Sequence, residues 1–231
     1  MTDWLVDFHV HTAASFDCLC RPEAVLARAR RRGLDRVAIT DHDTWTAART
    51  LAARAPEAVL VGAEVRTREG VDIIGLLLRE PVAPGQPLRA TCEAIREQGG
   101  VVVVPHPFDP RRGGAGPYLD TILDLIDAVE GHNARARPAA NARARAWAVA
   151  RRLPLTAGSD AHTLAEIGRG AVRLPPFEPT RASLLAALRR GALARTVHSG
   201  LWVHVGSTYA KFARRFHRPA LDLPGAEGGE R

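Results

Sequence analysis

The chain has 231 residues, of which 46% are hydrophobic and 25% are charged. This length favours one large domain or two small ones, and no apolar stretch approaches the length of a membrane-spanning helix. The N-terminus runs directly into a strand pattern without the regions of a secretory signal, so we expect a soluble, cytoplasmic protein.

Arginine carries almost all of the positive charge, because the formal net charge is +7 and Lys211 is the only lysine. A positive field raises the local concentration of anions, which modestly favours phosphorylated small molecules or nucleic acid as partners. Three cysteines, Cys18, Cys20 and Cys92, lack the second Cys/His pair of a zinc knuckle. We interpret them as reduced thiols that bind no metal.

Apolar strand-like runs alternate with helical patterns along most of the chain. The runs cover residues 5–10, 36–39, 58–65, 72–78, 101–104, 126–129 and 155–157, with a weaker one at 171–174. Between them, residues 22–32, 45–55 and 88–98 have helix-start residues at or just before their first positions. Strand followed by helix, repeated about seven times, predicts a parallel α/β layout, with 58–65 and 72–78 forming a local hairpin.

The alternating pattern ends near residue 195, so we expect one barrel-sized domain over residues 1–195 and an extension over 196–231. Residues 203–217 place apolar side chains opposite Lys211 and several arginines, which predicts an amphipathic helix. The last dozen residues are rich in Pro, Gly and Glu and are predicted to be disordered.

Two clusters of titratable residues lie early in the chain. Strand geometry places Asp7, His9 and His11 on one face of the first strand, where two imidazoles can bind one metal ion. By itself this pattern also fits two surface histidines on an edge strand. The segment 40–43, Thr-Asp-His-Asp, places Asp41 and His42 at the end of the second strand, where barrel active sites gather.

Three later segments repeat this placement. Glu64 interrupts an apolar strand, where a buried carboxylate is costly unless a cation offsets it. His106 stands between two prolines after the run 101–104, and Asp160 and His162 follow the strand at 155–157. Imidazole and carboxylate ligands without a thiolate pair suit zinc, manganese or iron, and their number implies more than one ion.

Taken together and in this order, the five segments resemble the PHP (polymerase and histidinol phosphatase) family over residues 4 to about 195. This resemblance implies a distorted (β/α)7 barrel of the PHP type, followed here by a short C-terminal helical extension. The amidohydrolase barrel also begins with two histidines on a strand, but it often bridges its metals with a strand-borne lysine. Lys211 lies outside the predicted strands, which favours PHP.

The resemblance further implies a ligand set for two or three divalent metal ions. It groups His9, His11, Glu64 and Asp160 around one ion. It groups Asp17, His42 and His162 around a second, and Glu64 and His106 serve a third, with Glu64 bridging. Many relatives have a further His or Glu where this chain offers Asp72, so a two-metal site or a loosely held third ion remains open.

Other residues are candidates for catalysis and substrate binding. Asp41 or His132 can transfer a proton, although Asp41 is better suited to hold a ligand imidazole in place. Among the arginines of loops near the metals, Arg135 is preferred for phosphate because it lies with Asn133 in a stretch shared with relatives. The other arginines of these loops are Arg111, Arg112 and Arg169.

The predicted function is hydrolysis of a phosphate ester on a small molecule by metal-activated water. A nucleotide, a nucleoside bisphosphate and other phosphomonoesters are candidate substrates. The first alternative is a nuclease acting on single-stranded or short oligonucleotides, for which aromatic side chains are scarce. The second is a metal-containing binding or regulatory protein whose basic C-terminal segment docks on a partner or an acidic membrane. The sequence does not determine the oligomeric state.

Overall fold

The computed structural model describes residues 2–200, 208 and 210. The predicted tail, and the predicted helix at 203–217 apart from residues 208 and 210, lie outside this part of the chain. The described strands are β1 (Trp4–Val10), β2 (Arg36–Ile39), β3 (Val59–Arg66), β4 (Asp72–Leu76), β5 (Val101–Val104), β6 (Ala128–Asn133), β7 (Leu155–Gly158), β8 (Gly170–Leu174) and β9 (Ala192–Thr196). The helices are α1 (Pro22–Arg31), α2 (Thr46–Arg54), α3 (Leu88–Glu97), α4 (Pro138–Ala150) and α5 (Arg181–Arg190), with 3₁₀ turns η1 (Pro110–Arg112) and η2 (Gly116–Thr121).

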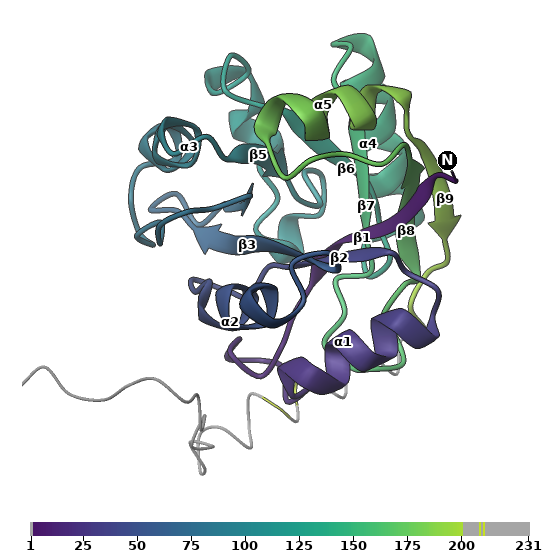
Figure 1. Cartoon of the computed structure of the whole chain (residues 1–231). Helices are drawn as coiled ribbons and strands as arrows, with labels where there is room; N and C mark the ends of the chain where they lie inside the picture. Colours follow the sequence, from purple (N-terminus) through teal and green to yellow (C-terminus); the bar gives the residue numbers. More distant parts are fainter. Residues whose placement is uncertain (1, 201–207, 209, 211–231) are drawn as a thin grey trace, which may run out of the picture.

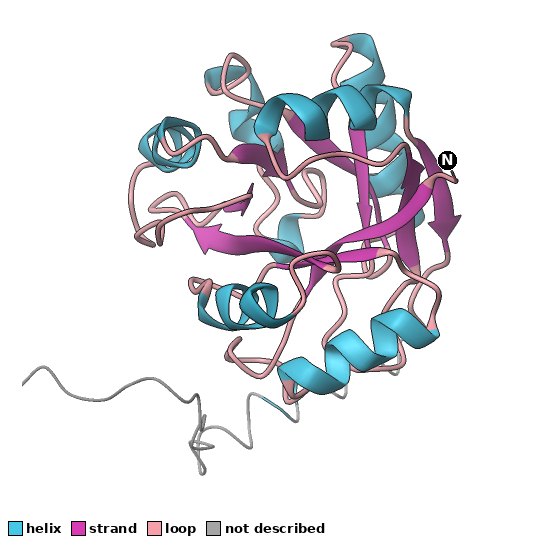
Figure 2. Ribbon diagram, in the orientation of Figure 1, coloured by secondary structure: helices cyan, strands magenta, loops and turns pink. Residues whose placement is uncertain are grey.

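The strands form one sheet in the order β7-β6-β5-β4-β3-β2-β1-β8-β9. Figures 1 and 2 show that this sheet curls into a nearly closed barrel with helices around its outside. The predicted α/β barrel is therefore confirmed. Most predicted runs match a strand to within about three residues. Strand β6 extends beyond its predicted run to Asn133, and the apolar pattern missed this part because it contains polar side chains of the site.

The strand directions differ in part from the predicted parallel layout. Pairs β1–β2, β2–β3, β5–β6 and β6–β7 are parallel, and β3–β4 is the expected antiparallel hairpin. The pairs β4–β5 and β1–β8 are also antiparallel, so the parallel expectation is wrong for these two. Strand β9, which was not predicted, pairs antiparallel with β8. The hairpin reverses β4, and β5 then runs opposite to it. No helix is assigned between β7 and β8, and β8 runs back along β1.

The ends of β1 and β7 meet where the barrel closes. The backbone N–H of Asp160 donates to the carbonyl of His9 at 2.7 Å, and the N–H of His11 donates to the carbonyl of Ala161 at 3.0 Å. Gly158 is required at this junction, because a Cβ atom there would lie 2.2 Å from the Cβ of His9. The close approach places the loop after β7 directly beside the first two histidines.

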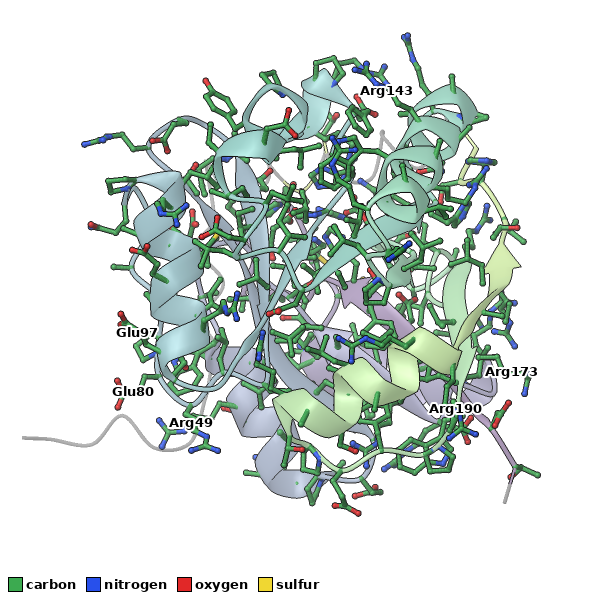
Figure 3. The ribbon with its side chains drawn as sticks, turned by 90° about the horizontal axis from the view of Figure 1, so that it is seen from above. Arg49, Glu80, Glu97, Arg143, Arg173 and Arg190 are labelled. Atoms are coloured by element: carbon green, nitrogen blue, oxygen red, sulfur yellow. The ribbon has the colours of Figure 1, made fainter. Side chains whose placement is uncertain are left out.

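Apolar side chains fill both the barrel and the layer beneath the helices. Successive strands contribute Phe8, Ala38, Leu60 and Ile74 to one buried cluster, in which each large side chain contributes about 1.5–3 kcal/mol. Two other clusters pack the sheet against its surrounding helices. Charged side chains such as Arg49, Glu97, Arg173 and Arg190 lie at the outer surface (Figure 3). None of the described helices is long and apolar enough to cross a membrane.

Candidate metal centre

Strand direction explains why the predicted ligands meet. Strands β1, β2, β3, β5, β6 and β7 all run the same way, so their carboxyl ends lie at one end of the barrel. Because β4 is antiparallel to its neighbours, its first residue, Asp72, lies at that same end. All eight residues predicted to bind metal come from these strand ends or from the loops that follow them.

Glu64 lies at the centre of the cluster. Its Oε2 atom is 3.3 Å from Nε2 of His9, 3.4 Å from Nε2 of His11 and 3.2 Å from Nδ1 of His42. Its other oxygen, Oε1, lies 2.9 Å from Nε2 of His106. The carboxylate is 1% exposed, so a bridging role between metal ions fits its position, as the resemblance implied.

Asp160 and Asp17 extend the cluster on the side of β7. Oδ1 of Asp160 makes no hydrogen bond and lies 3.5 Å from both Nε2 of His11 and Nδ1 of His162. Asp17 Oδ1 is 3.1 Å from Nε2 of His162 and 3.8 Å from Nε2 of His42. The buried Oδ1 atom of Asp160, which faces two imidazole nitrogens, is placed as a carboxylate ligand of a cation would be.

Four groupings of His, Asp and Glu in the described chain have ligand atoms close enough to hold an ion. They are His11–His42–His162, His9–His11–Glu64, His9–His106–Asp160 and Glu64–Asp72–His106. None of these groupings contains a cysteine, and the sulfurs of Cys18 and Cys20 instead donate to the backbone carbonyl of His162. The residues present therefore fit divalent ions with imidazole and carboxylate ligands.

Hydrogen bonds orient the imidazoles. Nδ1 of His9 pairs with Oε1 of Glu130 at 3.0 Å, and Nδ1 of His11 pairs with Oγ of Ser15 at 3.0 Å. The ring of His162 is held through Nδ1 by the backbone carbonyl of Asp160 at 2.9 Å. Each partner leaves Nε2 of its histidine facing the cluster, as hydrogen-bonded metal-binding imidazoles do.

The backbone is strained at two of the candidate ligands. His106 and Asp160 adopt φ angles of 29° and 50°, a region that residues with a side chain rarely occupy. Such conformations cost of order 1–3 kcal/mol and cluster at functional sites, where the surrounding structure holds them in place. Both side chains point into the cluster as a result.

Asp41 lies behind the cluster. Oδ1 accepts hydrogen bonds from the backbone N–H of Thr12 at 2.6 Å and the hydroxyl of Ser15 at 2.7 Å, and Oδ2 accepts from the hydroxyl of Thr12. Ser15 in turn contacts His11, so Asp41 acts on the imidazole through that hydroxyl. This geometry favours the positioning role over direct proton transfer.

Asn133 and Arg135, predicted to bind substrate, are both engaged with other residues of the protein. Nδ2 of Asn133 lies 2.9 Å from Oε2 of Glu130 and 2.9 Å from Oδ2 of Asp160. Arg135 forms a bidentate pair with Glu166, with Nε to Oε1 at 2.6 Å. Glu166 also accepts from the backbone N–H of His162, so this ion pair steadies the His162 loop.

A basic cavity of about 240 Å³ opens above the cluster. Its lining includes His42, His106 and His162, the carboxylates Asp17 and Asp72, the ring of Phe16 and the arginines Arg66, Arg111, Arg112 and Arg135. Arg169 and His132, which were also predicted to act in the site, do not line this cavity. Arg169 donates a hydrogen bond to the backbone carbonyl of His198, and the ring of His132 packs against the ring of His198. The cavity therefore places several arginine side chains beside the cluster, and their positive charges suit an anionic ligand.

Burial and neighbouring charges set the protonation of the cluster. Burial, with a smaller contribution from the neighbouring imidazole of His162, lowers the pKa of His11 to about 4, and burial lowers that of His42 to about 4. Burial raises the pKa of Glu64, but the imidazoles of His9 and His42 outweigh it and hold that pKa well below its usual value. Burial lowers the pKa of His9, but the carboxylates of Asp160, Glu64 and Glu130 outweigh it and hold that pKa well above its usual value, so His9 has to release a proton when a metal ion binds.

Comparison with known proteins places the chain in a family. The PHP domain family matches residues 7–164, which includes the whole ligand cluster, and a PHP-associated family matches residues 138–193. The chain belongs to the PHP family. It is also 37% identical over 142 residues to an uncharacterized protein of Methanocaldococcus jannaschii, an alignment that covers 55% of this chain and 81% of the relative.

Solved structures share the PHP fold at low sequence identity. A two-domain protein of Bacteroides vulgatus that contains a predicted PHP-like metal-dependent phosphoesterase superposes with a TM-score of 0.70 at 18% identity. The match covers 84% of this chain and 65% of that protein. A lesion-specific endonuclease of Pyrococcus furiosus superposes with a TM-score of 0.62 at 16% identity, covering 83% of this chain and 57% of that one.

Sequence reasoning missed the roles of Glu130 and Glu166. Glu130 is 1% exposed and supports His9, His106 and Asn133 at once. It stands in an apolar run, Ala128–Val129, and the signal that identified Glu64 applies to it equally. Glu166 lies within the loop between β7 and β8. No comparable sequence signal marked it, because its role depends on its contacts with Arg135 and His162 in the folded protein.

Proposed function

We propose that this PHP protein hydrolyses phosphate esters of small molecules with the help of two or three divalent metal ions. The observation that carries the proposal is the buried Glu64 carboxylate, whose Oε2 lies within 3.4 Å of nitrogens of His9, His11 and His42. Buried imidazoles gathered around carboxylates are the set of ligands that divalent cations use in proteins. The candidate substrates are nucleotides, nucleoside bisphosphates and other phosphomonoesters.

The proposed ligand set divides the cluster as follows. His9, His11, Glu64 and Asp160 surround one ion, Asp17, His42 and His162 surround a second, and Glu64 and His106 contribute to a third. Asp72 is the additional oxygen ligand within reach of Glu64 and His106. Zinc, manganese or iron bound there would polarise a phosphoryl group and acidify a bound water molecule.

The residues around the cavity supply the rest of the site. Arg66, Arg111 and Arg112 line the opening and attract a phosphate group toward the cluster. Asp41 and Glu130 hold His11 and His9 in the orientation that presents Nε2 to the ligand space. Burial of the cluster excludes bulk water from the reacting group, which strengthens every charge interaction inside it.

Metal analysis combined with an activity assay tests the proposal. We expect two or three zinc, manganese or iron ions per purified chain, and phosphate release from members of a panel of nucleotides and sugar phosphates. His9→Ala should lose both metal and turnover, whereas His198→Ala, which removes an exposed histidine outside the cluster, should keep both. A wild-type protein that binds no added metal would refute the proposal.

A nuclease is the second candidate, and the position of Phe16 favours it. This ring is 52% exposed, lines the cavity and stacks on His42 with a centroid distance of 5.0 Å. An exposed ring beside cationic side chains is a platform on which a base can stack, worth about 1–3 kcal/mol per base. Cleavage of oligonucleotides that becomes faster with length, with little turnover of mononucleotides, would select this function instead.

A further inference from the structure

Arg112 pairs with Asp160, one of the residues predicted to bind metal, as Arg66 pairs with Asp72 on another side of the cavity. One amine of its guanidinium forms an ion pair with Oδ2 of Asp160, while the side chain remains 19% exposed to the cavity. Asp160 Oδ2 is also held by Asn133 at 2.9 Å, and Oδ1 faces the imidazoles. Arg112 is thus next to the metal cluster without occupying the ligand atom that faces it.

The backbone around Arg112 fixes where the side chain begins. Arg112 ends the turn η1, which Asp109 caps by accepting from the N–H of Arg111. The next residue, Gly113, has a φ of 69°, and its carbonyl accepts from the N–H of Asp72 at 2.9 Å. A Cβ at Gly113 would lie 2.6 Å from Oδ2 of Asp72, so the turn is pressed against the start of β4.

The guanidinium itself is incompletely satisfied. Nε of Arg112 is enclosed, and it has no hydrogen-bond acceptor among the described residues. An enclosed N–H without an acceptor is costly, and a small rotation of the side chain toward an oxyanion in the cavity would remove that cost. The planar fork of arginine matches two oxygens of a phosphate group.

We propose that Arg112 is the residue that binds the phosphoryl group and positions it against the Asp160 side of the metal cluster. This inference rests on the proposed function, because it assigns the anion-binding role within the same site. Arg135 is the less suitable residue for this role, because its fork is already paired with Glu166. Arg112 instead has an unsatisfied Nε and pairs with Asp160 through one amine.

If Arg112 binds the phosphoryl group, its replacement should weaken phosphate binding without weakening metal binding. Arg112→Met keeps the length of the side chain and removes its charge and its fork. The affinity for inorganic phosphate should fall about 10- to 100-fold, as expected for loss of charged hydrogen bonds. Metal affinity should stay the same or increase, because Asn133 still holds Asp160 and a neighbouring positive charge no longer opposes the cations.

Calorimetric titration of the full-length protein measures both effects, first with manganese and then, on the manganese-loaded protein, with inorganic phosphate. Arg143→Met is the matched control, because it removes the same charge from an exposed position on α4 and should change neither affinity. If Arg112→Met folds poorly, Arg112→Lys retains the charge without the fork and should still weaken phosphate binding several-fold. KM for any turned-over phosphate ester should rise in parallel.

Two results would overturn the inference. One is weaker metal binding by Arg112→Met or Arg112→Lys with unchanged phosphate affinity, which would make Arg112 a structural partner of Asp160. The other is phosphate binding by the wild type that neither substitution alters. A metal-loaded wild type that binds phosphate through Arg112 but hydrolyses no ester would contradict the proposed function and leave the role of Arg112 intact.

Discussion

Replacement of Glu130 by glutamine should disable the metal centre by changing the tautomer of His9. Oε1 of Glu130 faces Nδ1 of His9 at 3.0 Å, while Oε2 accepts from the backbone N–H of His106 at 2.8 Å and from Nδ2 of Asn133 at 2.9 Å. A glutamine has only one acceptor oxygen, so it can accept either from His9 or from the pair His106 and Asn133, but not from both.

If the amide oxygen faces His106 and Asn133, the amide N–H₂ points at His9. Nδ1 of His9 must then accept, so its proton moves to Nε2, the atom that faces Glu64 and the cluster. If the amide is turned the other way, its N–H₂ opposes the N–H of His106. Loss of such a supporting partner typically weakens metal binding 10- to 100-fold, which corresponds to about 1.4–2.7 kcal/mol.

Competition with a chromophoric chelator measures this change for zinc and manganese in Glu130→Gln and wild type. Glu57→Gln is the control, since it removes one negative charge from an exposed ion pair with Arg30. We expect Glu57→Gln to match the wild type. Metal affinity of Glu130→Gln within threefold of the wild type, in a variant that folds normally, would show that Glu130 does not set the tautomer of His9.

Three further perturbations follow from the packing and protonation of the site. Gly158→Ala would place a Cβ 2.2 Å from that of His9 and 2.5 Å from Oε1 of Glu130, so urea unfolding should show a loss of at least about 2 kcal/mol, and an unchanged midpoint would contradict the packing. Burial, with a contribution from the neighbouring imidazole of His198, lowers the pKa of His132 to about 4, so below pH 6.5 the unfolded chain binds a proton that the folded chain does not. Stability should therefore fall by roughly 2–3 kcal/mol between pH 6.5 and 4, and His132→Gln should show a correspondingly smaller fall in urea titrations. Removal of metal with a chelator should lower the midpoint of thermal unfolding, because ions bound only by the folded state contribute about 4 kcal/mol at a thousand times their Kd, and equal midpoints with and without chelator would argue against a resident ion.

Most of the candidate ligands could be picked out from the sequence, because they follow or interrupt an apolar run, and polar residues at strand ends stand out when their neighbours are buried. Asp17 follows no such run, and only the resemblance to the PHP family indicated it. The parity of the strand puts His9 and His11 on one face, which depends only on the two-residue repeat of an extended chain. The hairpin of β3 and β4 was also predictable, because a short polar link joins two apolar runs.

The partners of these residues required the tertiary structure. Arg135 was expected to bind phosphate, yet it pairs with Glu166, which lies 31 positions further along the chain. His9 is oriented by Glu130, 121 positions away, and the directions of β5 and β8 depend on how the chain returns to the sheet. Local sequence specifies which side chains are polar and which are buried, but hydrogen-bond partners depend on distances that exist only once the barrel has closed.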